Sequence, residues 1–453
     1  MRVWPDASRT ALLTTAMTAA GFVLTLYVFY PGIMTFDARY VYQDIAKGFF
    51  GDWQSPVMTY LWSLIDPIAP GPASLLLLTA ALYWLAFGLL ALTMARRSPR
   101  LALLLPLLAL SPPAFIFVGI IWRDVLFAIA WLLATASTFA MAGHGWKMRA
   151  PALAIGLVLL AFGVLLRPNA IAAAPVLAAY ILWPSHFSWK RTAILYLPVA
   201  LGLYGLVQVI YYGVLGATRQ HPLHSIMVFD LGGISHFAKD NRFPGSWSAQ
   251  ETRLITEGCY KPIAWDVYWT QEPCKFVMAR LEGDKIFGTP ALAHAWKRAI
   301  TTHPIAYLQH RVAFMRAFLA DASLTMWTMD LDDTSKTAFS DNPRLMALKT
   351  LHDALKPTPL FRAGTWLLLN IVWCFFAWRR RDTPAGAFVI GICGSAVIYM
   401  MTFFAIGVAT DFRYALWAVL AGLAGIVAVA PRPNDAAGAA DRTRLATEDF
   451  RTR

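Results

Sequence analysis

Runs of about 20 apolar residues, the length that crosses a bilayer as an α-helix, alternate with short polar segments along most of this chain. Helices are expected to be the spanning elements, because a helix satisfies its own backbone hydrogen bonds in lipid. The pattern predicts an all-α membrane protein with about ten transmembrane helices, near residues 11–30, 73–95, 101–120, 123–142, 152–167, 169–184, 193–213, 363–378, 385–405 and 413–430.

One long polar interval, residues 216–360, interrupts the apolar pattern. Its later part places apolar residues three and four positions apart, from Ala291 to Ile300 and from Pro304 to Ala320, as amphipathic helices do. The predicted organisation is an N-terminal transmembrane module at 1–215, a mainly helical extracytoplasmic domain at 216–360, a C-terminal transmembrane module at 361–430 and a disordered cytoplasmic tail at 431–453.

The first outside loop, residues 31–72, has its own pattern. Tyr40 and Ile45 recur at near-helical spacing with Asp44 on the polar face, which predicts an amphipathic helix on the membrane surface. The apolar piece at 57–65 is too short to cross a bilayer, so we expect it to lie in the interface.

Composition and charge agree with a membrane protein. The 453 residues are 58% hydrophobic and only 14% charged, which excludes one soluble globule of this length. The net charge of +13 could suggest a nucleic-acid partner, but the basic residues form short clusters between spans, as cytoplasmic loops do. We therefore expect both termini in the cytoplasm and no nucleic acid as a partner, with the basic clusters at Arg96, Arg97 and Arg100, at Lys147 and Arg149, at Lys190 and Arg191, and at Arg379, Arg380 and Arg381.

The four cysteines divide into two pairs. Cys374 and Cys393 lie in predicted spans, where they are expected to pack as small apolar residues. Cys259 and Cys274 lie fifteen positions apart in the outside segment, where an oxidising compartment would permit a disulfide. The alternative is two unrelated thiols.

Candidate chemistry concentrates in the first outside loop, which holds Asp37, Asp44, Asp52 and Asp66 in a protein with only 26 acidic residues. Asp37 directly follows the first span, where an apolar lining could raise its pKa and suit it to act as a general base. The alternative is an interfacial carboxylate that only marks the end of a span. The chain has no Walker P-loop and no GxSxG, HExxH or paired CxxC motif, so we expect any chemistry at the outside membrane face.

Two short motifs in this loop resemble a known family. Asp37-Ala38-Arg39-Tyr40, an amphipathic helix, and Gly51-Asp52-Trp53 with Pro56 resemble the first outside loop of GT-C glycosyltransferases, notably protein mannosyltransferase-like enzymes and the bacterial aminoarabinose transferase of lipid A. The resemblance implies transfer of a sugar from a polyprenyl-phosphate donor to an extracytoplasmic glycan, lipid A or protein. It also implies a bacterial inner-membrane protein with its active site on the periplasmic face.

Residue roles follow from the same resemblance. Asp37 matches the catalytic acid of the first loop, which accepts the acceptor's proton during an inverting attack. Asp124 matches the second acidic position and could bind a divalent cation, orient the acceptor or support Asp37; a local ion pair with Arg123 is the alternative. The chain departs from the aminoarabinose transferase after Pro56, where Val57-Met58-Thr59 replaces a lysine-containing motif, so other residues must bind the donor.

Arginines at the outside face are the candidates for the donor phosphate, because charge builds on a phosphate leaving group. Arg167 and Arg413 could each present a planar fork to phosphate, or could simply reach lipid headgroups. Further substrate-binding candidates are Arg39, Tyr40, Arg123, Asp411 and Tyr414.

Other polar residues have a more ordinary interpretation. The run Asp330-Leu331-Asp332-Asp333 could chelate a metal but is more typical of a solvated turn. Histidines of the outside segment could line an acceptor site or could be packed or surface residues: His221, His224, His236 and His303.

Two other functions compete with glycosyl transfer from a polyprenyl phosphate. An O-antigen ligase or polymerase would depend on an arginine or histidine of 216–360 rather than on Asp37. A flippase or transporter of lipid-linked sugars would carry charged residues within its spans, whereas nearly all ionisable residues here fall at span ends.

Overall fold

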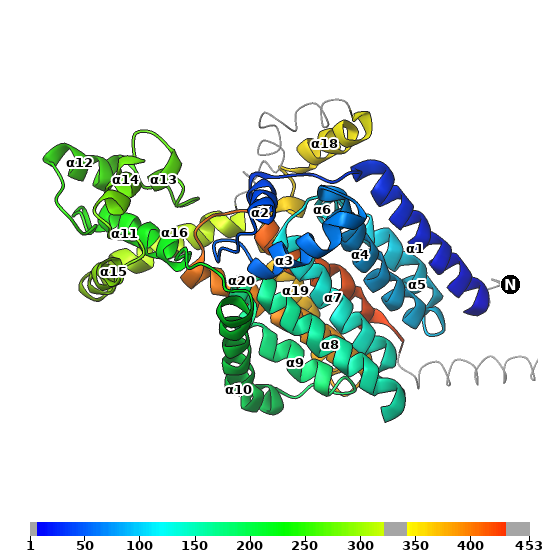
Figure 1. Cartoon of the computed structure of the whole chain (residues 1–453). Helices are drawn as coiled ribbons and strands as arrows, with labels where there is room; N and C mark the ends of the chain where they lie inside the picture. Colours follow the sequence, from blue (N-terminus) through cyan, green and yellow to red (C-terminus); the bar gives the residue numbers. More distant parts are fainter. Residues whose placement is uncertain (1–6, 321–341, 432–453) are drawn as a thin grey trace, which may run out of the picture.

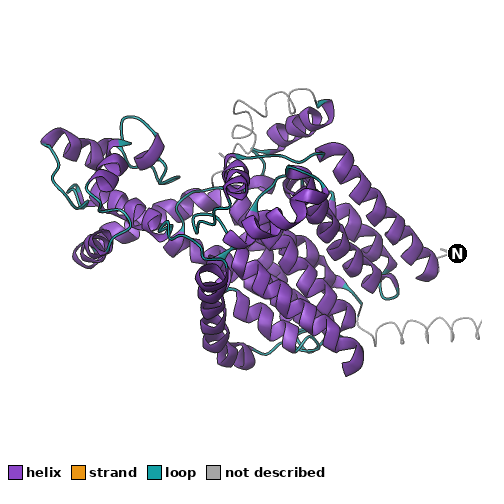
Figure 2. Ribbon diagram, in the orientation of Figure 1, coloured by secondary structure: helices purple, strands orange, loops and turns teal. Residues whose placement is uncertain are grey.

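The structure is a computed structural model that describes residues 7–320 and 342–431. Figures 1 and 2 show a helical bundle with a smaller helical lobe projecting from one end. The described residues contain helices and three isolated backbone bridges but no β-strand. The predicted all-α membrane fold is therefore confirmed.

Seven helices of the described chain are long and apolar enough to cross a bilayer. Each coincides with a predicted span, because a long apolar run is itself the condition for crossing. They are α1 (Ala7–Phe29), α4 (Pro72–Ala95), α7 (Arg123–Met141), α8 (Trp146–Leu166), α10 with its π-helical extension (Trp189–Val214), α20 (Pro384–Ile406), and α21 (Leu416–Ala424) with its flanking 3-10 turns (Phe412–Val429).

Three predicted spans differ from single full-length helices. The range 101–120 forms α5 (Pro99–Ala109) and α6 (Pro112–Val118), which meet at 57° because Pro112 starts a new helix. The range 169–184 contains a 3-10 turn and α9 (Ala174–Leu182), whereas 363–378 is α19 (Ala363–Trp378) of 16 residues. By length and composition seven helices of the described chain, or eight with the bent pair, could cross a membrane, against about ten predicted spans.

The first outside loop folds into α2 (Phe36–Lys47) and α3 (Pro56–Ile65), followed by a 3-10 turn (Asp66–Ile68). Helix α2 ends at Gly48, whose φ of 62° is left-handed and favours glycine. Asp44 lies with Ala38 and Val41 on the buried face of α2, so its expected place on a solvated polar face is wrong. The reason is that α2 packs against protein along this face instead of lying alone on a surface.

The lobe comprises the helices between the seventh predicted span and residue 320 (Figure 1). Within it, Cys259 and Cys274 form a disulfide. Its helices are α11 (Leu223–Ala238), α12 (Ala249–Arg253), α13 (Val267–Thr270), α14 (Phe276–Gly283), α15 (Pro290–Thr302) and α16 (Pro304–Ala320).

Helix α18 (Pro343–Leu355) lies apart from the lobe, beside α1 (Figure 1). Asn342 Nδ2 donates to the Val28 carbonyl, and Arg344 Nη1 donates to the Tyr27 carbonyl. The run Asp330-Leu331-Asp332-Asp333 and the tail after residue 431 lie outside the described residues.

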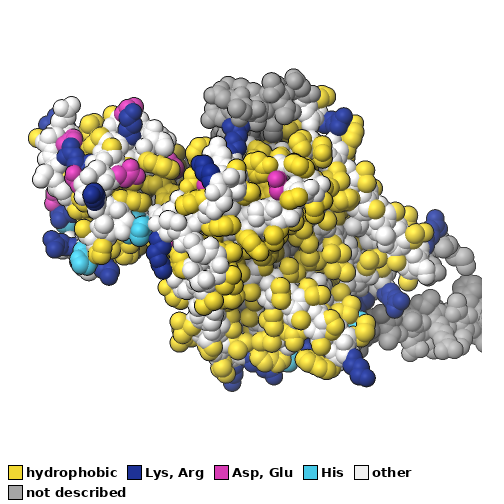
Figure 3. All heavy atoms as spheres, in the orientation of Figure 1, with side chains coloured by type: hydrophobic (Ala, Val, Ile, Leu, Met, Phe, Trp, Pro, Cys, Tyr) yellow, Lys and Arg dark blue, Asp and Glu magenta, His cyan; other side chains and the backbone are white. Residues whose placement is uncertain are grey.

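The basic loops gather at the end of the bundle away from α2. The loop before α10 joins the loop before α20 through a bond from Phe187 N to Arg381 O, and Ser185 Oγ donates to Ala142 O. Figure 3 shows hydrophobic side chains over the side of the bundle and Lys and Arg along this far edge. This distribution agrees with an integral membrane protein whose basic loops share one face.

Candidate active site

Three short backbone pairings bring distant loops together. Each is an isolated bridge rather than a strand, so it fixes a loop without building a sheet. The pairs are Ile33 with Ile120, Gly51 with Thr218, and Ala264 with Ala409. The first places the Asp37 loop beside the start of α7, and the third places the lobe beside the start of the last span.

Asp37 lies in the first turn of α2. Thr35 caps this helix, because its side-chain oxygen accepts from Ala38 N at 3.3 Å. A carboxylate in the first turn of a helix is stabilised by the positive end of the helix dipole. Asp124 occupies the equivalent position in α7, so both predicted catalytic acids begin helices.

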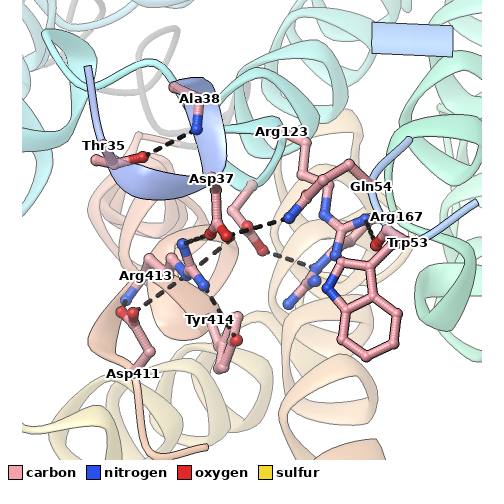
Figure 4. A network of polar contacts seen from close by, with 11 residues as sticks. Thr35, Asp37, Ala38, Trp53, Gln54, Arg123, Arg167, Asp411, Arg413 and Tyr414 are labelled. Carbon is pink, nitrogen blue, oxygen red and sulfur yellow. Dashed lines mark hydrogen bonds and ion pairs between the residues drawn. The ribbon is translucent and has the colours of Figure 1, made fainter. Parts of the chain in front are cut away.

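Both carboxylate oxygens of Asp37 are bound (Figure 4). Arg413 Nη1 lies 2.5 Å from Asp37 Oδ2, and Gln54 Nε2 donates to Asp37 Oδ1 at 3.1 Å. The Asp37 and Arg413 side chains are 25% and 12% exposed. The pair is therefore mostly enclosed by protein but still reaches solvent.

Arg413 is shared among three carboxylates. Its Nε lies 3.1 Å from Asp411 Oδ2 and 4.0 Å from Asp124 Oδ2, in addition to the contact with Asp37. The guanidinium also stacks over the Trp122 ring at 4.6 Å and lies 5.2 Å from the Tyr414 ring centroid. These contacts hold the guanidinium in place from several sides.

Asp124 is paired mainly with Arg167. Arg167 Nε lies 2.7 Å from Asp124 Oδ1, and the Asp124 side chain is only 4% exposed. The Arg167 guanidinium lies 4.6 Å from the Tyr414 ring centroid. Arg123 instead directs Nη1 to the Trp53 carbonyl at 3.3 Å, so the ion pair of Asp124 is formed with more distant residues than its neighbour in sequence.

The pKa of Asp37 is lowered, contrary to the expectation of a raised value. Burial alone would raise this pKa, but the charge of Arg413 and its hydrogen bond outweigh burial, with smaller effects from Arg123 and Arg167. Burial raises the pKa of Asp411, against the opposing charge of Arg413. The Asp37 carboxylate is thus bound by a cation, rather than lying free in an apolar pocket.

The other first-loop candidates lie away from the Asp37–Arg413 pair. Tyr40 OH accepts from Gln220 Nε2 at 2.8 Å, and Arg39 follows Asp37 by two residues, about 200° around the helix. Asp52 accepts from Tyr212 OH at 2.7 Å and from Gln220 N at 2.6 Å. Asp52 and Tyr40 therefore hydrogen-bond the first outside loop to the segment at the end of the seventh predicted span.

Three residues at the site were missed in the sequence. Gln54 and Trp53 follow Asp52 in the motif that already suggested a family, so that motif could have indicated them. Asp266 lies in the lobe, where burial and the Asp37 charge raise its pKa and Arg413 opposes them. No local signal marks Asp266, because the charge of Asp37 acts on it from a segment far away in the sequence.

A metal site is not evident in the part of the chain that the structure describes. No group of three or more His, Cys, Asp or Glu side chains is placed there to hold an ion. The acids Asp37, Asp124 and Asp411 instead surround a guanidinium. Two of the lobe histidines have packing roles, since His224 Nδ1 accepts from Gly288 N and His236 stacks on Tyr260.

Comparisons with known proteins gave matches to solved structures. No protein-family model and no curated protein matches the chain. The oligosaccharyltransferase of Archaeoglobus fulgidus aligns with a TM-score of 0.38 and 13% identity, over 92% of this chain and 48% of its own. ArnT from Cupriavidus metallidurans, bound to undecaprenyl phosphate, aligns with a TM-score of 0.33 and 14% identity, over 92% of this chain and 77% of its own.

These structural neighbours are both GT-C membrane glycosyltransferases, the superfamily that the first loop resembles. The chain spans about half the length of the oligosaccharyltransferase it matches.

Proposed function

We propose that this protein is a membrane glycosyltransferase that moves a sugar from a polyprenyl-phosphate donor to an acceptor outside the cytoplasm. The observation that carries the proposal is the contact between Asp37 and Arg413. These residues are 376 positions apart in sequence, yet their side chains meet at 2.5 Å beside Asp124 and Arg167. A proton acceptor thereby adjoins cations that suit a phosphate leaving group.

Asp37 acts as the general base in this mechanism. Its carboxylate takes the proton of the acceptor hydroxyl as that oxygen bonds to the anomeric carbon. The bond from the anomeric carbon to the phosphate oxygen breaks at the same time, and its electron pair leaves with the polyprenyl phosphate. Attack from the face opposite the leaving group inverts the anomeric configuration.

Arg413 links donor binding to release of the base. In the resting site its Nη1 is bound to Asp37 Oδ2. A donor phosphate is a competing anion, and a guanidinium binds phosphate through two parallel hydrogen bonds. As Arg413 turns to the phosphate, Asp37 loses its ion pair, its pKa rises toward the ordinary value and Oδ2 becomes free to accept a proton.

Asp124 and Arg167 support this exchange. Asp124 is too enclosed to meet an acceptor, with 4% of its side chain exposed, but it holds Arg167 at 2.7 Å. Its second oxygen is 4.0 Å from Arg413 Nε and so offers that guanidinium a partner when Asp37 is released. We assign Asp124 to positioning the two arginines, and both arginines to the donor phosphate.

Sugar transfer by the purified protein tests this proposal. With undecaprenyl-phosphate-linked sugars and lipid A as the first panel, Asp37→Asn should lower kcat at least about 100-fold, since it removes a general base. Donor binding should survive. Asp66→Asn is the matched control in the same loop, because Asp66 accepts from Gly71 N and Tyr42 OH, away from Arg413.

Other outcomes would assign other functions. Wild-type transfer by a folded Asp37→Asn protein would remove Asp37 from catalysis. Movement of a lipid-linked sugar across liposomes without any glycosylated product would favour a flippase. An essential histidine of the lobe together with a tolerant Asp37 would favour a ligase or polymerase.

A further inference from the structure

The lobe segment closed by the Cys259–Cys274 disulfide reaches the candidate active site. Trp265 N donates to the Val408 carbonyl at 2.8 Å, and Thr410 N donates to the Ile263 carbonyl at 2.9 Å. These bonds attach the segment to the residues just before Asp411 and Arg413. Side chains on the segment are therefore held at a defined place beside the acids.

Three tryptophans meet where this segment approaches the first loop. The rings of Trp265 and Trp269 stack with centroids 5.5 Å apart and an angle of 19°. Trp53 of the first loop lies 5.8 Å from Trp265 and 5.9 Å from Trp269. We call these three residues the indole cluster.

The indole cluster is continuous with the groups that hold Asp37. The Trp53 carbonyl accepts from Arg123, and the next residue, Gln54, donates to Asp37 Oδ1. Arg413 binds the other oxygen, Oδ2. Figure 4 accordingly shows Arg413 on one side of Asp37 and Gln54 with Trp53 on the other.

Packing alone does not account for the cluster. Trp265 is 6% exposed, as expected for a ring between the lobe and the bundle, but Trp269 is 41% exposed. Asp266, between them in sequence, is partly buried and is the N-cap residue of α13. The cluster thus combines an open aromatic surface with a carboxylate.

That combination suits a pyranose ring. One face of a pyranose is lined with C–H groups, which pack on the electron-rich face of an indole, while its hydroxyls donate to a neighbouring carboxylate. The donor phosphate belongs on the Arg413 side of Asp37. An inverting attack places the acceptor across the anomeric carbon from the phosphate, and Trp53 of the indole cluster lies across Asp37 from Arg413.

We propose that Trp53, Trp265 and Trp269 form a subsite for a pyranose ring of the acceptor, with Asp266 accepting hydrogen bonds from its hydroxyls. The inference rests on the proposed function. It makes the acceptor a glycan or the sugar headgroup of a glycolipid, rather than a protein side chain.

Acceptor kinetics of Trp269→Ala provide the test, because this exposed ring can be removed with little effect on folding. KM for a glycan or lipid A acceptor should rise about tenfold, the order expected for loss of one aromatic contact, with kcat and donor KM unchanged. Trp269→Phe should recover part of the loss. Trp146→Ala, which removes a 66% exposed tryptophan of α8, is the matched control and should leave KM unchanged.

Binding without donor separates this inference from the proposed function. Saturation-transfer NMR on the full-length protein, with methyl glycosides of hexoses and N-acetylhexosamines as probes, should detect ring contacts that Trp269→Ala removes. Such binding in a protein with no transfer activity would keep the subsite and reject the transferase. The subsite would be overturned if Trp269→Ala left the acceptor KM for transfer unchanged. This holds for a glycan acceptor and for a serine- or threonine-containing peptide.

Discussion

Two enclosed arginine–carboxylate clusters within the described residues differ in how completely they are buried. In the lobe, Arg311 Nε lies 2.8 Å from Asp230 Oδ1, and both side chains are fully buried with His310. Trp296 Nε1 donates to Asp230 Oδ2 at 2.7 Å, and Arg311 Nη1 donates to the Gly407 carbonyl at 2.8 Å. This cluster joins the lobe to the end of α20.

The cluster at Arg413 has more acids and more access. Three carboxylates share one guanidinium, and the Asp37 side chain keeps 25% of its surface exposed. In the Asp230 cluster, Arg311 pairs with a single carboxylate, and both side chains are fully buried, so a ligand cannot reach them. Burial of a charge is therefore a poor mark of function by itself. The Arg413 cluster differs from the Asp230 cluster in having surplus carboxylates and a partly exposed one.

The largest expected effect is the loss of transfer activity when the arginine of the Arg413 cluster is replaced. Arg413→Gln should lower transfer by about 100- to 1,000-fold, as loss of a transition-state donor does, while the protein stays folded. Arg413→Lys should recover little, since an ammonium lacks the planar fork. Rates and thermal unfolding measured on the same detergent-purified samples decide the matter, and a rate loss that merely tracked unfolding would contradict the assignment.

Arg311→Leu should instead lower the stability of the fold. It leaves Asp230 as an uncompensated buried charge, which we expect to cost about 3–5 kcal/mol of unfolding free energy. The double variant Asp230→Leu, Arg311→Leu removes both charges and should regain part of that loss. Denaturant unfolding of the three proteins provides the measurement; a stable Arg311→Leu protein would refute a structural role.

The smallest effect concerns pH. The lowered pKa of Asp37 means that its ion pair stabilises the folded protein above the unfolded-state value, about pH 4, and that this stability is lost as pH falls through the lowered pKa. Asp37→Asn should therefore be less stable than wild type at neutral pH, by no more than about 1 kcal/mol, and equal to it in strong acid. A difference that grew on acidification would mean that the pKa is raised instead.

The sequence predicted the positions of most helices because apolar runs are local signals. Predicted spans differ from single full-length helices at α9, which has nine residues, and at Pro112, where a new helix begins. The burial of Asp44 could not be predicted, because nothing local tells which face of α2 meets the bundle.

The sequence indicated four residues that lie together in the candidate site, but not the direction of the Asp37 pKa shift. The motif resemblance and the arginines at span ends selected Asp37, Asp124, Arg167 and Arg413, which the structure brings together. The direction of the Asp37 pKa shift was wrong, because it depends on Arg413, 376 residues away. Tertiary contacts of this kind have no periodic signal.

The Cys259–Cys274 disulfide has a consequence for the conditions that the lobe segment requires. Disulfides form and persist in oxidising compartments, and this one closes the segment that carries Trp265 and Trp269. Asp37 and Arg413 lie instead on segments adjoining the membrane spans, which contain no disulfide within the described residues. Closure of that segment therefore depends on an oxidising environment, whereas the pairing of Asp37 with Arg413 requires no disulfide.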